Sequence, residues 1–228
     1  TGEIIPVDNK GNVLRFIAKD IPSSGYATFV PVDGQKPENA VTTIADGINN
    51  IIENEFLKVK IDPAKGAVVS VVDKKSGREM VDQNSEYGFG QYIYERFSKK
   101  NTTEYTDKYL KINLWWGQVE FGRPNIDDTP YKRVDGGKAK VTYSSDAVSV
   151  KAVMQFTKEM GNPHNYSLTF SLNKNLPYLE LNWFIDGKEA EPWPEAGWIS
   201  FPVKVENPQD KVGRLGAVME PEKDSKRG

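Results

Sequence analysis

The chain has 228 residues and no cysteine, so no disulfide bond can hold its fold. Its formal net charge is −2, and the sequence has no basic stripe of the kind that nucleic-acid binding requires. No apolar run reaches the roughly 18 residues that a membrane-spanning helix needs. Nucleic acid and membrane are therefore not expected as partners. The compartment is not predicted, although a secreted or periplasmic parent protein agrees with the composition.

The N-terminal part of the chain is predicted to be a remnant of a small domain. Residues 1–34 contain two strand-like stretches, Val13–Ala18 and Tyr26–Val32, separated by a polar turn. Two strands cannot bury a core by themselves, so we interpret them as the end of a preceding small β-domain. Residues 35–50 contain proline, glycine and few aromatic residues, and they are predicted to be a linker.

A β-hairpin is the clearest predicted element of the chain. Apolar and lysine side chains alternate over residues 57–61, a period of two that turns one face to a core and the other to water. Residues 62–66 supply turn-forming Asp, Pro and Gly, and a mostly β-branched strand returns over residues 68–72. A second reversal is predicted at residues 73–77.

The rest of the chain is predicted to be all-β. Four further stretches alternate apolar and polar side chains: 148–156, 166–172, 179–185 and 201–205. Turn-forming residues separate these stretches at the spacing typical of a sandwich, and no window favours a long amphipathic helix. We therefore predict one large antiparallel β-sandwich over residues 51–228. Of the adjacent Trp115 and Trp116, one is expected in the core and the other at the surface.

The hairpin sequence from Glu53 to Glu79, ENEFLKVKIDPAKGAVVSVVDKKSGRE, resembles the opening of the large C-terminal β-domain of family 38 glycoside hydrolases, the retaining α-mannosidases. The segment Phe16–Phe29, FIAKDIPSSGYATF, is similar to the end of the small β-domain that precedes it. The resemblance implies a galactose mutarotase-like supersandwich, truncated near the charged tail at residues 220–228. It also implies a missing N-terminal catalytic domain of the same protein as a partner.

No catalytic residue and no metal ligand are predicted in this chain. A retaining glycosidase needs two carboxyl groups across the sugar, and the resemblance implies that these, together with a zinc ion held by His and Asp, belong to the missing domain. The single histidine here, His164, lies beside Pro and Asn and is expected to be a solvated turn residue. Zinc is therefore expected as a cofactor only in the missing catalytic domain.

A first candidate for carbohydrate contact is Tyr92. The sequence Gly90–Tyr94, GQYIY, resembles a family motif of the form Gly-Ala-Tyr-apolar-Phe, whose tyrosine reaches the sugar in the catalytic pocket. The resemblance implies that Tyr92 contacts substrate from a surface facing the missing domain. The sequence departs from the motif at Gln91 and in the charged Glu95 and Arg96 that follow. The alternative is that Tyr92 and Tyr94 are same-face strand residues packed in a core or interface.

A second candidate region surrounds Trp193, Glu195 and Trp198. An indole stacks on the apolar face of a pyranose while a carboxylate accepts its hydroxyl groups, so this pattern is typical of a sugar site. Prolines on both sides of Trp193 favour an extended loop. The alternative is structural, with Trp198 opening a buried strand and Trp193 closing the edge of the sandwich.

Three classes of function remain open. The first is a non-catalytic β-domain of a mannosidase-like glycoside hydrolase, which supports the catalytic domain and contributes to carbohydrate binding. The second is an independent carbohydrate-binding module, favoured if the aromatic candidates gather on an exposed face. The third is an aldose-epimerase-like enzyme, whose chemistry usually needs a histidine with a carboxylate. The single turn-borne histidine argues against this third class.

Overall fold

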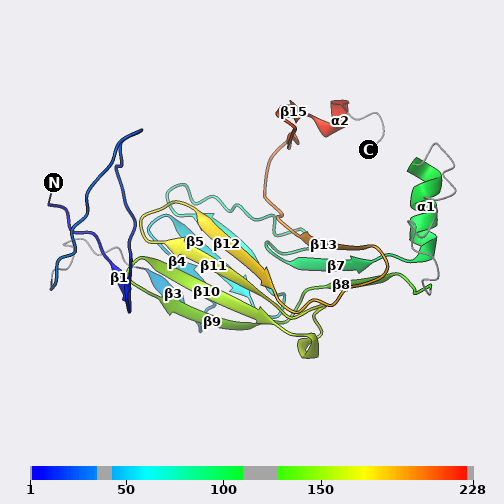
Figure 1. Cartoon of the computed structure of the whole chain (residues 1–228), viewed down its shortest axis with the longest axis horizontal. Helices are drawn as coiled ribbons and strands as arrows, with labels where there is room; N and C mark the ends of the chain where they lie inside the picture. Colours follow the sequence, from blue (N-terminus) through cyan, green and yellow to red (C-terminus); the bar gives the residue numbers. More distant parts are fainter. Residues whose placement is uncertain (1, 35–42, 110–127, 225–228) are drawn as a thin grey trace.

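The computed structural model describes residues 2–34, 43–109 and 128–224, and Trp115 and Trp116 lie outside these ranges. The described residues form antiparallel strands, two α-helices and one 3-10 helix (Figure 1). The strands are β1 (Asp8–Lys10), β2 (Val13–Arg15), β3 (Ile44–Asp46), β4 (Ile51–Glu53), β5 (Leu57–Asp62), β6 (Ala67–Asp73), β7 (Tyr92–Arg96), β8 (Lys132–Asp135), β9 (Lys140–Ser145), β10 (Ser149–Phe156), β11 (Tyr166–Asn173), β12 (Leu179–Ile185), β13 (Glu195–Ile199), β14 (Val212–Arg214) and β15 (Ala217–Met219). The helices are α1 (Lys99–Tyr109), η1 (Lys158–Met160) and α2 (Pro221–Asp224).

Two four-stranded sheets form the body of the molecule. One has the order β3-β4-β5-β6 and the other β12-β11-β10-β9, and β10 packs on β3 and β4 (Figure 1). Apolar side chains fill the space between them, and the largest fully buried ones there include Phe156, Phe170 and Ile52. The predicted all-β sandwich is confirmed, because each sheet buries its apolar face against the other.

The predicted hairpin is confirmed as β5 and β6. Its first strand alternates buried and exposed residues from Leu57, and the two strands pair antiparallel. In the turn, the Asp62 carboxylate accepts hydrogen bonds from the backbone N–H groups of Ala64 (2.9 Å) and Lys65 (3.1 Å). Gly66 then adopts a positive φ of 63°, the left-handed conformation that favours glycine. The turn chemistry visible in the sequence therefore sets the register of this hairpin.

Asn54 joins the two sheets at one end of the sandwich. Its side chain is fully buried, and its Nδ2 donates to the carbonyl oxygens of Asn173 (2.7 Å) and Leu176 (3.0 Å). Its Oδ1 accepts from the backbone N–H groups of Phe56 (2.9 Å) and Leu57 (2.8 Å). A single amide thus ties the entry to β5 to the turn between β11 and β12.

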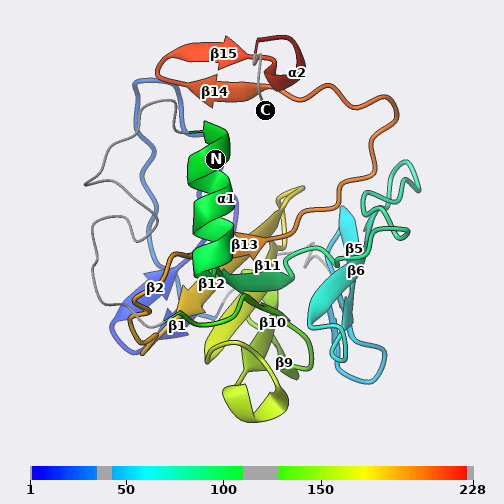
Figure 2. The same ribbon diagram turned by 90° about the vertical axis from the view of Figure 1, so that its right-hand side faces the viewer.

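A third sheet, with the order β13-β7-β8, continues from the sandwich, and α1 rises from its end (Figures 1 and 2). The sequence analysis did not predict α1, because its polar sequence has no apolar stripe and only Thr102 is buried. A local signal does exist. Asn101 Oδ1 accepts from the Ser98 backbone N–H (3.0 Å) and the Asn101 N–H lies 3.3 Å from Ser98 Oγ, the reciprocal pattern of a capping box.

The N-terminal segment matches its prediction only in part. Strand β2 lies in the first predicted stretch and pairs with β1, whereas residues 26–32 form no strand. Arg15 anchors the segment to the sandwich through Asp146 Oδ2 (3.2 Å) and Ser149 Oγ (3.3 Å). Strand β3 lies inside the predicted linker and belongs to a sandwich sheet, so residues 44–46 are part of the sandwich rather than a free connection.

The C-terminal part shows one wrong prediction. Residues 201–205 alternate like a strand, yet only Val203 forms an isolated bridge, to Val81, and its side chain is half exposed. Alternation of apolar and polar side chains does not by itself make a strand, because the backbone must also pair along its length with a neighbouring strand. Beyond it, β14 and β15 form a small hairpin away from the sheets (Figure 2). Within the described ranges, neither α-helix is long and apolar enough to cross a membrane.

Candidate functional site

Strands β7 and β13 carry most of the candidate residues. They pair antiparallel in the register Glu195 with Arg96, Gly197 with Tyr94 and Ile199 with Tyr92. Because side chains alternate along a strand, these residues share one face of the sheet, which we call the inner face. Glu95 and Trp198 point to the opposite side, the outer face, where they are hydrogen-bonded to each other.

Tyr92 lies on the inner face and is buried. Its exposed fraction is 4%, and its ring centroid lies 5.1 Å from that of Tyr166 and 5.4 Å from that of Trp183. Its hydroxyl lies 3.5 Å from Nδ1 of His164. Burial, with a further contribution from Glu195, raises the pKa of Tyr92. The expectation that its ring lies on an exposed surface is wrong in this structure, because β11 and β12 cover the inner face.

His164 is also buried, with an exposed fraction of 8%, so its prediction as a solvated turn residue is wrong. Its ring packs edge-on against Tyr94, with 4.6 Å between centroids, and lies 6.1 Å from that of Tyr92. Burial and the charge of Lys188 lower the pKa of His164, against the opposing effect of Glu195. The imidazole is therefore held in its neutral form near pH 7.

Glu195 is the half-buried carboxylate at the rim of the inner face. Its Oε2 accepts a hydrogen bond from the Tyr94 hydroxyl at 3.0 Å, and its Oε1 is paired with the ammonium of Lys188. Burial and this hydrogen bond raise the pKa of Tyr94. An ion pair between Arg96 and Glu191 (3.6 Å) lies on the neighbouring part of the rim. The rim thus presents hydrogen-bonding groups of both charges beside buried aromatic rings.

The two tryptophans of the second candidate region are separated by the fold. Trp193 is only 1% exposed, so its indole offers no free face for a sugar in this structure. Trp198 is 55% exposed on the outer face, and its Nε1 donates to Glu95 Oε2 at 2.8 Å. The structure therefore brings Tyr92 and Glu195 to one face and places Trp198 on the other.

The sequence analysis assigned no site role to the residues that complete both faces. Those residues are Tyr94, His164 and Lys188 on the inner face, and Glu95 and Tyr131 on the outer face. Only Tyr94 had a sequence signal as a site residue, because a period of two places it on the same face as Tyr92. Glu95 lies on β7 itself, whereas His164, Lys188 and Tyr131 come from distant segments whose pairing no local pattern records.

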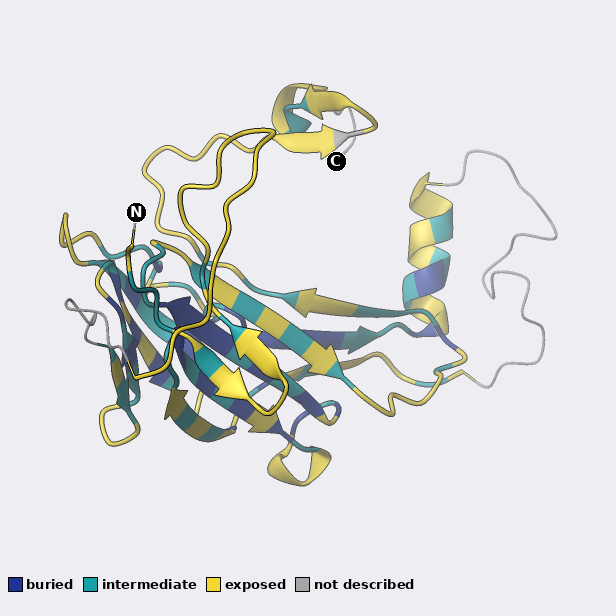
Figure 3. Cartoon of the chain, turned by 60° about the vertical axis from the view of Figure 1, so that its left-hand side comes forward, coloured by how far each residue is buried: buried dark blue, intermediate teal, exposed yellow. Residues whose placement is uncertain are grey.

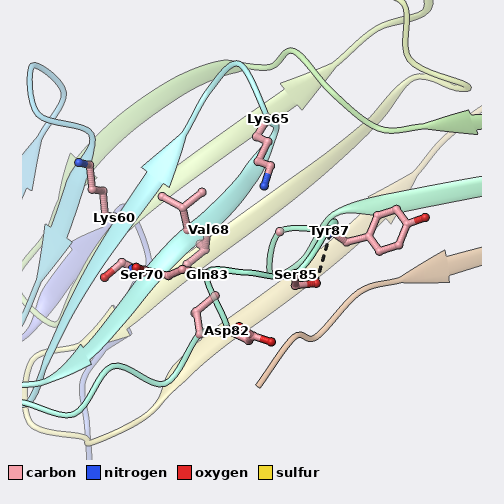
Figure 4. A pocket seen from close by; sticks show the side chains of 11 residues that line it. Lys60, Lys65, Val68, Ser70, Asp82, Gln83, Ser85 and Tyr87 are labelled. Atoms are coloured by element: carbon pink, nitrogen blue, oxygen red, sulfur yellow. Dashed lines mark hydrogen bonds between the residues drawn. The ribbon is translucent and has the colours of Figure 1, made fainter. Parts of the chain in front are cut away.

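A separate hollow of about 210 Å³ lies between β5, β6 and residues 82–88 (Figure 4). Lys60, Lys65, Asp82 and Gln83 are among the residues that line it, and Tyr87 lies at one end. The candidate site residues predicted from the sequence, Tyr92, Trp193, Glu195 and Trp198, do not line this hollow. In the described part of the chain, no three His, Asp or Glu side chains are grouped so that they could hold a metal ion.

The family model of the glycosyl hydrolases family 38 C-terminal domain matches residues 52–220. This range covers the greater part of the chain. It includes the β12-β11-β10-β9 and β13-β7-β8 sheets, and the other sandwich sheet apart from β3 and the first residue of β4. The chain therefore belongs to this family, as the hairpin sequence implied. The comparison with curated protein sequences found no match.

The buried position of Tyr92 predicts the effect of removing its hydroxyl. We expect Tyr92→Phe to lower the free energy of unfolding by about 1 kcal/mol, because the change removes a buried contact with His164 and keeps the ring packing. Urea unfolding of the chain measures this loss. Tyr178→Phe, at an exposed tyrosine, is the matched control and should shift the midpoint little. Equal, negligible shifts for both variants would contradict the burial of Tyr92.

Proposed function

We propose that this chain is the non-catalytic β-domain of an α-mannosidase-like hydrolase, which supports a catalytic domain of the same protein and contributes to carbohydrate binding. The observation that carries the proposal is the family match over residues 52–220, a range that contains most of the sandwich and both candidate strands, β7 and β13.

Exposed apolar side chains support a large partner domain. The N-terminal segment leaves Tyr26, Val30 and Ile21 exposed, and most of its described residues are accessible (Figure 3). Burying exposed apolar groups under a partner is favourable, since the water around them is released. We propose that the missing catalytic domain covers this segment.

The solvent exposure of the candidate side chains indicates which of them can contact a carbohydrate. Glu195 at the rim of the inner face and Trp198 on the outer face can reach a ligand, as a hydrogen-bonding carboxylate and an exposed indole respectively. Tyr92 and Trp193 are buried, and we propose that they support the sugar-contacting surface from within. The exposed Trp198 also favours the second function, a carbohydrate-binding module that acts without the catalytic domain.

Zinc belongs, in this proposal, to the catalytic domain. The described residues offer no cluster of ligands that fits a zinc ion, so no step through zinc is assigned to this chain. We likewise assign it neither of the two carboxyl groups that cleave the glycosidic bond.

The proposal predicts that the isolated 228-residue chain hydrolyses no aryl α-mannoside, with or without added zinc, because it places the catalytic carboxyl pair and the zinc ligands in the catalytic domain. Release of the aryl alcohol is measured under both conditions, with the longer parent protein as positive control. The parent should show turnover that a chelator abolishes. Zinc-dependent hydrolysis by the pure chain would refute the non-catalytic role, and a parent with no glycosidase activity would refute the hydrolase assignment.

A further inference from the structure

The outer face of the β13-β7-β8 sheet carries two exposed aromatic rings on either side of one carboxylate. Trp198 is 55% exposed and Tyr131, which directly precedes β8, is 43% exposed. Glu95 of β7 lies between them. We call Glu95, Trp198, Tyr131, Arg133 and Asp135 the outer-face platform.

Glu95 holds both rings in place. Its Oε2 accepts from Trp198 Nε1 at 2.8 Å, and its Oε1 accepts from the Tyr131 hydroxyl at 2.6 Å. The hydrogen bond to Glu95 raises the pKa of Tyr131 to about 12, so its hydroxyl keeps its proton at neutral pH. An exposed side chain normally loses rotamer freedom when a ligand binds. Here the polar ends are already restrained, which lowers that entropic cost.

Polar groups of both charges lie beside the rings. Arg133 Nε donates to Asp135 Oδ1 at 2.9 Å, and the Arg133 guanidinium also contacts Tyr87, with 5.3 Å from its Cζ to the ring centroid. Tyr87 in turn lies at the end of the hollow described above, so that hollow adjoins the platform. Flat apolar rings beside hydrogen-bonding groups match a pyranose, which has an apolar C–H face and a rim of hydroxyl groups.

We propose that the outer-face platform is a binding subsite for a neutral hexopyranose unit of an oligosaccharide, with the sugar ring on Trp198 and its hydroxyl groups toward Tyr131, Arg133 and Asp135. This inference rests on the proposed carbohydrate role of Trp198 and extends it to Tyr131, Arg133 and Asp135, on the face opposite Tyr92 and Glu195. Carboxylates at Glu95 and Asp135 flank the single guanidinium of Arg133, so the platform favours a neutral ligand over an anionic one.

The test follows the Trp198 indole N–H signal of the whole chain by NMR during titration with linear α-mannotriose. We expect a saturable shift with a dissociation constant of about 1 mM, the weak range of a small exposed site. Calorimetry on variants then locates the site. Trp198→Ala should weaken binding by about tenfold or more, and Tyr131→Phe by about threefold, because it frees Glu95 while keeping the ring.

Phe184→Ala is the matched control, since Phe184 is also an exposed aromatic residue on a strand, β12, and is 59% exposed. It should leave the affinity unchanged. Absence of a saturable shift in the millimolar range, or equal affinity of Trp198→Ala and the unchanged chain, would overturn the inference. A concentration-dependent self-association that Trp198→Ala abolishes, without sugar binding, would instead identify a contact between copies. These outcomes are independent of hydrolysis, so they are distinguishable from failure of the proposed hydrolase function.

Discussion

Gly66→Ala is expected to destabilise the chain by about 3 kcal/mol or more. Gly66 has a φ of 63°, and an added Cβ would lie 1.9 Å from the carbonyl oxygen of Gly137 and 2.6 Å from Cε1 of Phe156. The left-handed conformation alone costs an L-residue about 1–2 kcal/mol. The backbone oxygen cannot rotate away as a side chain could, so the turn or residues 136–139 must shift.

Gly77→Ala separates the cost of the left-handed backbone conformation from the cost of a steric clash of the added Cβ. Gly77 has a similar φ of 72°, and nothing lies within 4 Å of the position of an added Cβ. It should therefore show only the conformational cost, about 1 kcal/mol. Urea unfolding of both variants measures the difference. Equal losses would mean that the approach of the hairpin to Gly137 is not as close as the structure has it.

The Gly66 contact also matters for the candidate site. In the same turn, the carbonyl oxygen of Pro63 accepts a hydrogen bond from the Ala139 N–H group (2.8 Å). Nearby in the sequence, the Gly136 N–H group donates to the carbonyl oxygen of Tyr92 (2.6 Å). The Gln91 amide donates to Gly136 at 2.6 Å. The hairpin turn thus holds the connection from β8 to β9, and that connection holds β7. A shift at the turn is transmitted to the strand that carries Tyr92.

Asn54→Asp is expected to cost about 3 kcal/mol at pH 7. The substitution keeps the shape and the accepting oxygen, but it directs a carboxylate oxygen at two carbonyl oxygens that now receive hydrogen bonds from Nδ2. Because position 54 is fully buried, the charged form is strongly disfavoured and the pKa of the new carboxyl group rises. A group whose folded pKa is raised binds its proton more tightly in the folded state, so stability returns as the pH falls.

Asn54→Ala is the matched control for charge. It loses all four hydrogen bonds and should cost about 2–3 kcal/mol, without a pH dependence of its own. Urea midpoints between pH 4 and pH 8, read relative to the unchanged chain, separate the two variants. Parallel pH curves for Asn54→Asp and Asn54→Ala would show that the side chain is not enclosed at the junction of the sheets.

The strands were predictable where the local pattern carried the physical reason. In β5 the lysines alternate with Leu57 and its apolar neighbours, and in β10 and β11 the alternation extends over whole strands that bury one face. The same pattern at residues 201–205 was misleading. There the backbone meets no strand along its length, and periodicity records only that a segment is able to pair, not that a partner is present.

The candidate site was predictable only in its parts. Motif resemblance singled out Tyr92, and the combination of indole and carboxylate singled out Glu195 and Trp198. Their distribution over two faces depends on the pairing of β13 with β7, which are about a hundred residues apart in the sequence. Sequence position by itself assigns neither the pairing nor its register, and a shift of one residue would exchange the two faces.

The sequence by itself determined the all-β class, the hairpin and the family, because these depend on side-chain alternation, turn chemistry and the order of residues along one stretch. The tertiary structure alone decided burial at the site. It enclosed Tyr92, His164 and Trp193, and it left Trp198 on the outer face beside Glu95. The physical reason is that solvent exposure is set by what packs across a face, and the covering strands and loops come from distant parts of the chain.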